Sequence, residues 1–99
     1  QFTLTIENNT TCTYELLIIE GTCSSVTTRQ NTVVYPGSNT YSIGTDVRRA
    51  KFIGCCGGST GSATVSYQCS PTINNTGVDC GTDDVIINFV QSDLIEISI

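Results

Sequence analysis

Six cysteines are the residues whose type and spacing say most about the chemistry of this chain. They occur among 99 residues that include no histidine, methionine or tryptophan. An even number of cysteines in so short a chain predicts about three disulfide bonds, which persist only in oxidising compartments. We therefore expect a secreted, extracellular or cell-surface protein whose disulfide cysteines are Cys12, Cys23, Cys55, Cys56, Cys69 and Cys80.

The adjacent pair Cys55-Cys56 invites a redox or metal interpretation. Neighbouring strand residues point to opposite faces, so these two thiols would serve two different partners. Zinc sites and thioredoxin-like sites use Cys-x-x-Cys spacing or histidine, and the chain has neither. We expect structural disulfides and no metal or cofactor. The pairing stays open because six cysteines combine in many ways, with a preference for Cys69 and Cys80 as a clamp on the loop between them.

The nine acidic residues are the other groups with catalytic or metal-binding potential. Without histidine the common catalytic triads cannot form, and nothing in the sequence marks a pair of acids as a glycosidase pair. Asp83 and Asp84, with Asp79 nearby, offer oxygen ligands to calcium, but the EF-hand pattern is absent. We expect a protein that is not an enzyme.

The basic residues are few, and three of the four are clustered. The net charge of −5 argues against nucleic acid and against anionic membrane surfaces as partners. In a strand Arg49 and Lys51 share one face, and Arg48 lies on the other. One interpretation of the cluster is a solvated edge whose charges prevent unwanted strand pairing. The other is a contact with an acidic partner, including Glu or Asp of another subunit.

Strands must position all of these residues. The chain is rich in Thr, Ile and Val, which suit a pleated, half-buried surface, and its apolar residues recur with a period of two. The run Leu16-Leu17-Ile18-Ile19 is apolar on both faces and predicts a central strand. Residues 70–82 form the longest irregular stretch. We expect strands at residues 2–7, 12–19, 26–29, 32–35, 40–43, 47–55, 62–69, 84–90 and 94–99.

Seven to nine short strands, spaced at about 8–12 residues, predict an all-β fold. We expect one domain over residues 1–99, a disulfide-stapled antiparallel β-sandwich with Greek-key or jelly-roll-like connections. The sequence Tyr35-Pro36-Gly37-Ser38 is a strong turn signal within it. No apolar run approaches the ~20 residues that span a membrane.

Both ends of the chain have strand patterns without a polar tail. Free termini fray unless something holds them, so each end is paired in its own sheet, or at least one pairs with another copy of the chain. The residues that would form such subunit contacts are the apolar terminal ones and the basic cluster: Phe2, Leu4, Ile6, Arg48, Arg49, Lys51, Ile95, Ile97 and Ile99.

Three Asn-x-Thr sequons begin at Asn8, Asn9 and Asn74. Each asparagine is a possible glycosylation site if the host glycosylates exported proteins.

The opening segment, residues 2–14, alternates apolar and polar residues and then runs Asn8-Asn9-Thr10-Thr11-Cys12. It resembles the first strand of thaumatin-like proteins, which differ in being longer, richer in cysteine and supplied with tryptophan. Together with the Pro36-Gly37 turn it also resembles small secreted bacterial β-sandwich modules of surface and filament type. The resemblance implies an exported sandwich.

Two functions fit these features. The first is a non-enzymatic structural protein, a filament, fibre or surface-layer subunit joined to other copies of itself by β-strand addition. This function is favoured by the strand-like chain ends, by the small number of charged residues and by stabilisation through disulfide bonds. The second is a monomeric secreted binding module for a surface glycan or protein, with some of the tyrosines Tyr14, Tyr35, Tyr41 and Tyr67 stacking on sugars.

Overall fold

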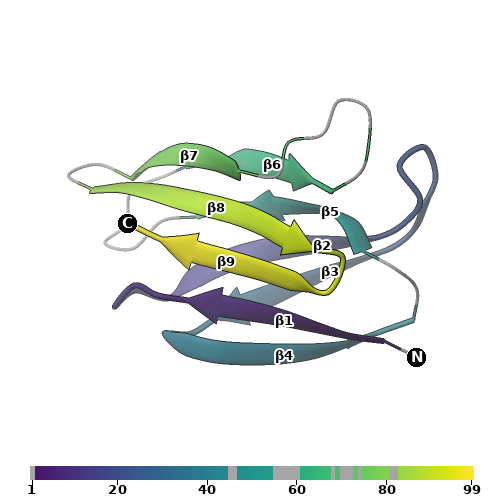
Figure 1. Cartoon of the computed structure of the whole chain (residues 1–99), viewed down its shortest axis with the longest axis horizontal. Coiled ribbons are helices and arrows are strands. Elements are labelled where there is room, and N and C mark those ends of the chain that lie inside the picture. Colours follow the sequence, from purple (N-terminus) through teal and green to yellow (C-terminus); the bar gives the residue numbers. More distant parts are fainter. Residues whose placement is uncertain are drawn as a thin grey trace.

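A computed structural model describes residues 2–44, 47–54, 61–67, 69, 73, 75–80 and 83–99 of the chain. The described residues form two β-sheets packed face to face, so the prediction of an all-β sandwich is confirmed (Figure 1). No helix among them is long and apolar enough to cross a membrane. The strands are β1 (Phe2–Asn8), β2 (Tyr14–Gly21), β3 (Val26–Val34), β4 (Gly37–Ile43), β5 (Val47–Phe52), β6 (Ala63–Ser66), β7 (Asn75–Cys80), β8 (Asp83–Gln91) and β9 (Leu94–Ser98).

The five-stranded sheet has the order β4-β1-β9-β8-β7, and the four-stranded sheet has the order β3-β2-β5-β6. Every pairing is antiparallel except that of β1 with β9, which is parallel. The chain crosses between the sheets after β1, β3, β4 and β6, in the Greek-key-like manner expected. The edge strands are therefore β3 and β4 on one side and β6 and β7 on the other (Figure 1).

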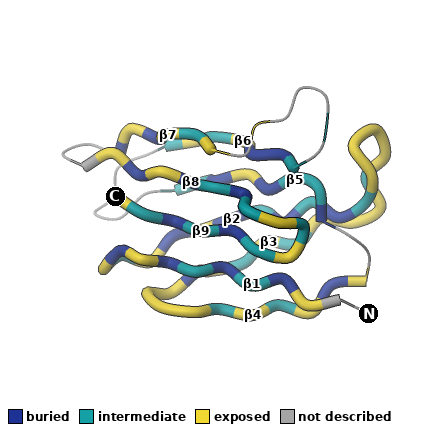
Figure 2. Tube along the Cα trace, in the orientation of Figure 1, coloured by how far each residue is buried: buried dark blue, intermediate teal, exposed yellow. Residues whose placement is uncertain are grey.

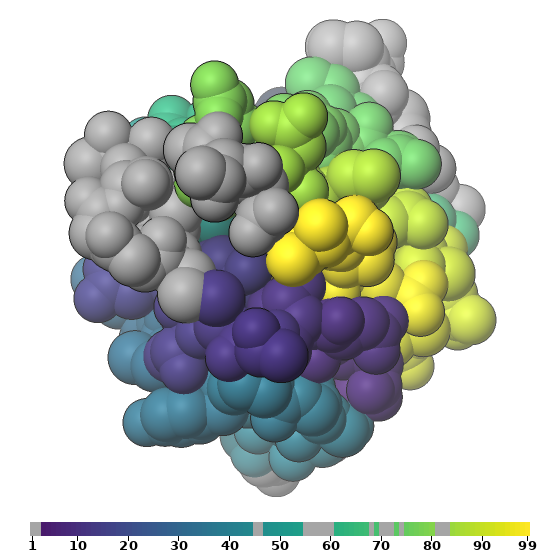
Figure 3. All heavy atoms as spheres, turned by 90° about the vertical axis from the view of Figure 1, so that its left-hand side faces the viewer, coloured from purple at the N-terminus to yellow at the C-terminus, as the bar shows by residue number. Residues whose placement is uncertain are grey.

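Both terminal strands lie inside the five-stranded sheet. β1 pairs with β4 on one side and with β9 on the other, and β9 lies between β1 and β8. Figure 3 shows the N-terminal segment in purple against the C-terminal strand in yellow. Of the two possibilities for the chain ends, pairing within their own sheet is the one that the fold adopts.

The core is the space between the two inner faces. Buried and exposed residues alternate along the strands, as the period of two predicts (Figure 2). Aromatic rings pack at both ends of this core, with 5.4 Å between the ring centres of Tyr14 and Phe52 and 5.7 Å between those of Tyr67 and Phe89. The largest side chains that are fully buried are Phe52, Phe89, Leu4, Ile6, Leu16, Ile18, Ile87, Ile95 and Ile97.

The prediction of a central strand at residues 12–19 is confirmed by β2, which lies between β3 and β5. Leu16 and Ile18 point inward and are fully buried. Leu17 and Ile19 point to the outer face of the sheet and are half-buried. A sandwich covers only one face of each sheet, so the second apolar set of this strand lies on the outside.

Two expectations about strands are wrong. The two strands predicted at residues 26–29 and 32–35 form one continuous strand, β3 (Val26–Val34), because the polar residues between them lie on an exposed edge that needs no apolar alternation. The stretch 70–82 contains β7, whose inward residues Thr76, Val78 and Cys80 alternate with polar residues and glycine. Its pairing with β8 stabilises a strand that its own composition does not signal.

Two glycines shape the connections of the strands. Gly21 ends β2 with a φ of 129°, a conformation that favours glycine, and an added Cβ would collide with the backbone of Ser25. Gly37 has a φ of 100° and begins β4 directly after Pro36, where the turn signal predicts a change of chain direction.

The sequence 8–12 forms a hydrogen-bonded turn after β1. Asn8 is buried, and its Nδ2 donates to the carbonyl of Cys12 at 2.7 Å. Its Oδ1 accepts hydrogen bonds from the backbone N–H of Thr10 at 3.0 Å and from the Thr10 hydroxyl at 2.7 Å. This network satisfies a buried amide and fixes the direction in which the chain leaves β1.

A disulfide joins Cys23, in the turn between β2 and β3, to Cys69, which follows β6. The preference for a Cys69–Cys80 bond is therefore wrong, because a partner distant in sequence lies nearer in the fold. Cys12 and Cys80 are also disulfide-bonded, and no described cysteine is free. Cys55, Cys56 and Asn74 lie outside the described residues.

Candidate functional site

Three of the four basic residues of the chain lie on the outer face of the four-stranded sheet. Arg29 of β3 and Arg49 of β5 are both opposite Ile19 of β2. One step along the sheet, Lys51 of β5 is opposite Leu17. The burial pattern puts all five side chains on the face away from the core. We call this surface, which consists of Arg29, Arg49 and Lys51 around Leu17 and Ile19, the basic face.

The cations of the basic face have few partners. Arg49 donates from Nη2 to the carbonyl of Thr22 at 3.3 Å, and its buried Nε has no hydrogen-bond partner. Within the described part of the chain, Arg29 and Lys51 form no ion pair. Their charges are therefore available to groups outside the molecule.

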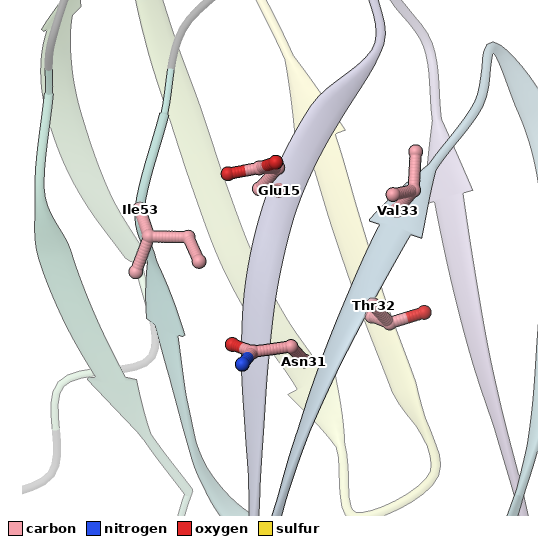
Figure 4. A pocket seen from close by; sticks show the side chains of 5 residues that line it. All are labelled: Glu15, Asn31, Thr32, Val33 and Ile53. Carbon is pink, nitrogen blue, oxygen red and sulfur yellow. The ribbon is translucent and has the colours of Figure 1, made fainter.

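A hollow of about 460 Å³ lies at one end of the same outer face (Figure 4). The carboxylate of Glu15, from β2, and Ile53, just beyond β5, lie on one side of it. The residues Asn31, Thr32 and Val33 of β3 complete its lining. A carboxylate and an amide beside two aliphatic side chains suit a small ligand that has hydrogen-bond donors.

The outer face of the five-stranded sheet carries the opposite charge. Glu7 of β1 is directly opposite Glu96 of β9, and Asp79 of β7 is opposite Asp84 of β8. The neighbouring side chains on this face are largely Thr, Ser and Asn, together with Ile86, which is 39% exposed. We call this surface, which consists of Glu7, Glu96, Asp79 and Asp84, the acidic face.

The like charges of the acidic face have one clear consequence for stability. Like charges directly opposite each other on neighbouring strands destabilise a sheet. Glu7 accepts a hydrogen bond from the Ser38 hydroxyl at 2.8 Å, but that group carries no charge. Neither Glu7 nor Glu96 forms an ion pair with any residue that the structure describes. Among the described residues, therefore, no cation offsets the repulsion between them.

The edge of β3 is a further open feature. The N–H of Ile53 donates to the carbonyl of Glu15 at 3.0 Å, so the backbone groups of Glu15 point toward β5. Because hydrogen-bonded pairs alternate in an antiparallel ladder, the N–H and C=O groups of its opposite residue, Val33, point away from β2. The same holds for Asn31 and Arg29, two and four residues earlier.

Part of this edge is already occupied. The hydroxyl of Tyr41 donates to the carbonyl of Val33 at 2.8 Å. The backbone groups of Arg29 and Asn31 have no described strand beside them. The open section of the edge thus lies in the middle of the longest edge strand of the sandwich.

The apolar residues predicted to form subunit contacts lie mostly in the chain's own core. Leu4 and Ile6 of β1 and Ile95 and Ile97 of β9 are fully buried. Ile99, at the C-terminus, is 63% exposed. Phe2 begins β1 in register with Ile43 of β4. A terminal strand can enter a neighbouring subunit only by leaving two partners in its own sheet.

The predicted basic cluster is divided by the structure. Arg49 and Lys51 share the outer face, as expected, but β5 lies between β2 and β6, so the interpretation as an edge strand is wrong. Arg48 falls at an irregularity in the β2–β5 pairing, and its carbonyl accepts the N–H of Tyr67 at 2.9 Å.

The other candidate residues differ in exposure. The Asn8 amide is held inside the turn described above, whereas Asn9 is exposed. Tyr14 is buried, Tyr41 and Tyr67 pack against the core, and Tyr35 is 60% exposed. Tyr35 is therefore the tyrosine best placed for stacking on a ligand.

The described residues contain no group of three or more His, Cys, Asp or Glu side chains placed to hold a metal ion.

Comparison of the chain with protein-family models, with curated proteins and with solved structures finds no match. The function must therefore be inferred from the surfaces themselves.

Sequence reasoning missed most residues of the two faces. Arg29 joins Arg49 only through the strand register, and Glu7 meets Glu96 only through the parallel pairing of the two chain ends. One signal was present in the sequence. A strand of a sandwich that is apolar on both sides, such as β2 with Leu17 and Ile19, implies that its outer face has apolar contacts to make.

Proposed function

We propose that this protein is a non-enzymatic, extracellular structural subunit that assembles with other copies of itself into a filament or surface layer by β-strand addition. Disulfide bonds, the low content of charged residues and the strand-rich fold support the proposal. A sandwich stapled by disulfides resists unfolding outside the cell, where such a subunit must last.

The open edge of β3 is the observation that carries the proposal. A long edge strand whose backbone groups are unpaired is a template for a strand from another chain. Natural edges are usually blocked by lysine, proline or a short strand, and the section from Thr28 to Thr32 has none of these protections apart from Arg29. Strand addition at β3 leaves β1 and β9 in place, so the subunit keeps its own fold during assembly.

Substitution of the open edge tests this proposal. The N–H of Asn31 points away from β2, so Asn31→Pro removes an outward donor without breaking the ladder within the sheet. At high salt, we expect wild-type protein to form fibres or sheets visible by electron microscopy, and Asn31→Pro to stay dispersed. The matched control, Asn31→Thr, keeps the N–H and should assemble. Dispersed wild-type protein, or normal fibres from Asn31→Pro, would contradict strand addition at β3.

The hollow at Glu15 favours a second candidate, a binding module for a small ligand such as a glycan. Its polar groups, Glu15 and Asn31, lie beside the aliphatic Val33 and Ile53. A glycan array with wild-type protein and with Glu15→Gln tests this function. If the wild type binds a glycan and Glu15→Gln abolishes that binding, the binding module is favoured. If the wild type binds no glycan on the array, this second candidate is contradicted.

A further inference from the structure

We propose that the basic face of one copy of this chain docks on the acidic face of the next copy, so that subunits stack sheet on sheet. The inference rests on the proposed function and adds a second contact, perpendicular to strand addition. It names the partner of the basic face as the acidic face of another copy.

Charge complementarity is the first argument. The chain has a net charge of −5, yet three of its four basic residues share one face, where Glu15 is the acid among the described strand residues. The opposite face carries Glu7, Glu96 and Asp84 without a basic residue in the described rows of the sheet. Complementary faces of this kind orient two molecules and suppress contacts between like faces.

The Glu7–Glu96 pair is the second argument. The backbones of Glu7 and Glu96 are about 5 Å apart, because this is the spacing between neighbouring strands of any sheet. Repulsion between their carboxylates destabilises the folded monomer. A lysine or arginine supplied by a neighbouring molecule would contact both carboxylates and relieve the repulsion. Lys51 and Arg49, two residues apart on one strand, present such cations side by side.

Area and apolar content are the third argument. The Cα atoms span 35 × 26 × 19 Å, and the sheets are stacked along the shortest direction (Figure 1). A face of 35 by 26 Å covers on the order of 900 Å², close to the ~800 Å² that each partner buries in a standard interface. Leu17 and Ile19 on the basic face and Ile86 on the acidic face supply apolar contacts between the charges.

The two faces lie on opposite sides of the molecule, so the contact is heterologous. Each subunit that docks leaves one basic face and one acidic face free, and the stack can continue without closing. Strand addition at β3 extends in the plane of the sheets, whereas face stacking extends perpendicular to it. The two contacts together would build a layer or a bundle.

Ionic strength distinguishes face stacking from strand addition. At about 0.01 M salt charges act over ~30 Å, and at 1 M over ~3 Å. We expect the weight-average mass of Asn31→Pro, which cannot add strands, to rise with concentration at low salt and to return to the monomer at high salt. Repulsion through the net charge alone predicts the opposite sign, with more association at high salt. That result, or a monomer at every salt concentration, would overturn the stacking proposal.

Charge reversal provides the decisive variants in the same Asn31→Pro background. Arg49→Glu with Lys51→Glu makes both outer faces acidic, and Glu7→Lys with Asp84→Lys and Glu96→Lys makes both basic. Each variant alone should associate on the order of tenfold more weakly than its parent, because like faces repel. An equimolar mixture should associate again, as alternating copies present opposite faces. Asp93→Lys, which reverses one charge in the exposed β8–β9 turn and outside both faces, is the control and should behave as the parent.

The outcomes separate the two proposals. Loss of fibres in Asn31→Pro with retained salt-sensitive association supports both contacts. Salt-sensitive association and rescue by mixing, in a protein whose wild type forms no fibres, supports face stacking and contradicts strand addition. A mixture that fails to associate overturns face stacking, and so does association of the parent with a sulfated polysaccharide in place of itself.

Discussion

The two outer faces of this sandwich differ, although its two inner faces are alike. The inner faces are aliphatic and aromatic in both sheets, as Leu16 and Ile18 of β2 and Ile95 and Ile97 of β9 illustrate. Outside, one sheet is basic around an apolar centre, and the other is acidic among small polar residues. Folding requires the inner match, but it does not require the outer segregation of charge. The proposed stacking of copies would make use of this segregation.

Removal of the Cys23–Cys69 bond should give the largest effect, and it should act on the sheet that carries the basic face. The bond closes a loop with a sequence separation of 46 residues, and such a bond stabilises by about 4 kcal/mol through the entropy of the unfolded chain. We expect Cys23→Ser with Cys69→Ser to lower the free energy of unfolding by that amount in urea denaturation.

Hydrogen exchange localises this effect. Protection should fall first at the turn between β2 and β3 and remain in β1 and β9, which are central in the other sheet. Ser24→Ala, in the same exposed turn, is the control and should leave stability unchanged. An equal loss of protection in both sheets would show that the two are not separable in this way.

The next largest effect is a difference in stability between two truncations in β2. Ile18 faces the core and Ile19 faces the basic face, so the two should cost different amounts of unfolding free energy. Ile18→Ala removes a fully buried side chain and should cost about 2–5 kcal/mol. Ile19→Ala should cost about 1 kcal/mol in the monomer, since its side chain is half-buried. Thermal and urea unfolding measure both. Equal costs would mean that the outer apolar residues belong to a packed core.

The smallest effect concerns the repulsion on the acidic face. Glu96→Lys replaces the repulsion of Glu7 by attraction and should raise the free energy of unfolding by roughly 0.2–1 kcal/mol. The gain should shrink as salt is added, and Glu96→Gln should fall between the two. A loss of stability in Glu96→Lys at low protein concentration would contradict the view that this face is strained by its own charges.

Local patterns were sufficient for part of the fold. The period of two in residues 2–7 and 94–99 predicted the terminal strands, and the double-sided run at Leu16–Ile19 predicted a central one. β7 was not predicted, because its outer face consists of Asn75, Gly77 and Asp79 and needs no apolar residues. The Cys23–Cys69 bond was not predicted, because tertiary structure, and not spacing along the chain, brings the two cysteines together.

Local sequence patterns could not predict the composition of the two outer faces, for the same reason. Arg49 and Lys51 share a face by strand periodicity, and this was predicted. Glu7 and Glu96 become neighbours only when the ends of the chain pair in parallel, and Arg29 joins the basic face only through its register with Ile19. Residues that meet across strands distant in sequence leave no signal in either strand alone.

Zero-length cross-linking tests the central claim, that the basic face of one copy contacts the acidic face of another, most directly. Lys51 is the only lysine of the chain, and a carbodiimide joins its amine to a carboxylate in direct contact. Within one molecule Lys51 and Glu96 lie on opposite outer faces. With mixed isotope-labelled and unlabelled copies at low salt, we predict Lys51–Glu96 or Lys51–Glu7 peptides that join different copies. Cross-links from Lys51 to Glu15 alone, or none to the acidic face, would contradict it.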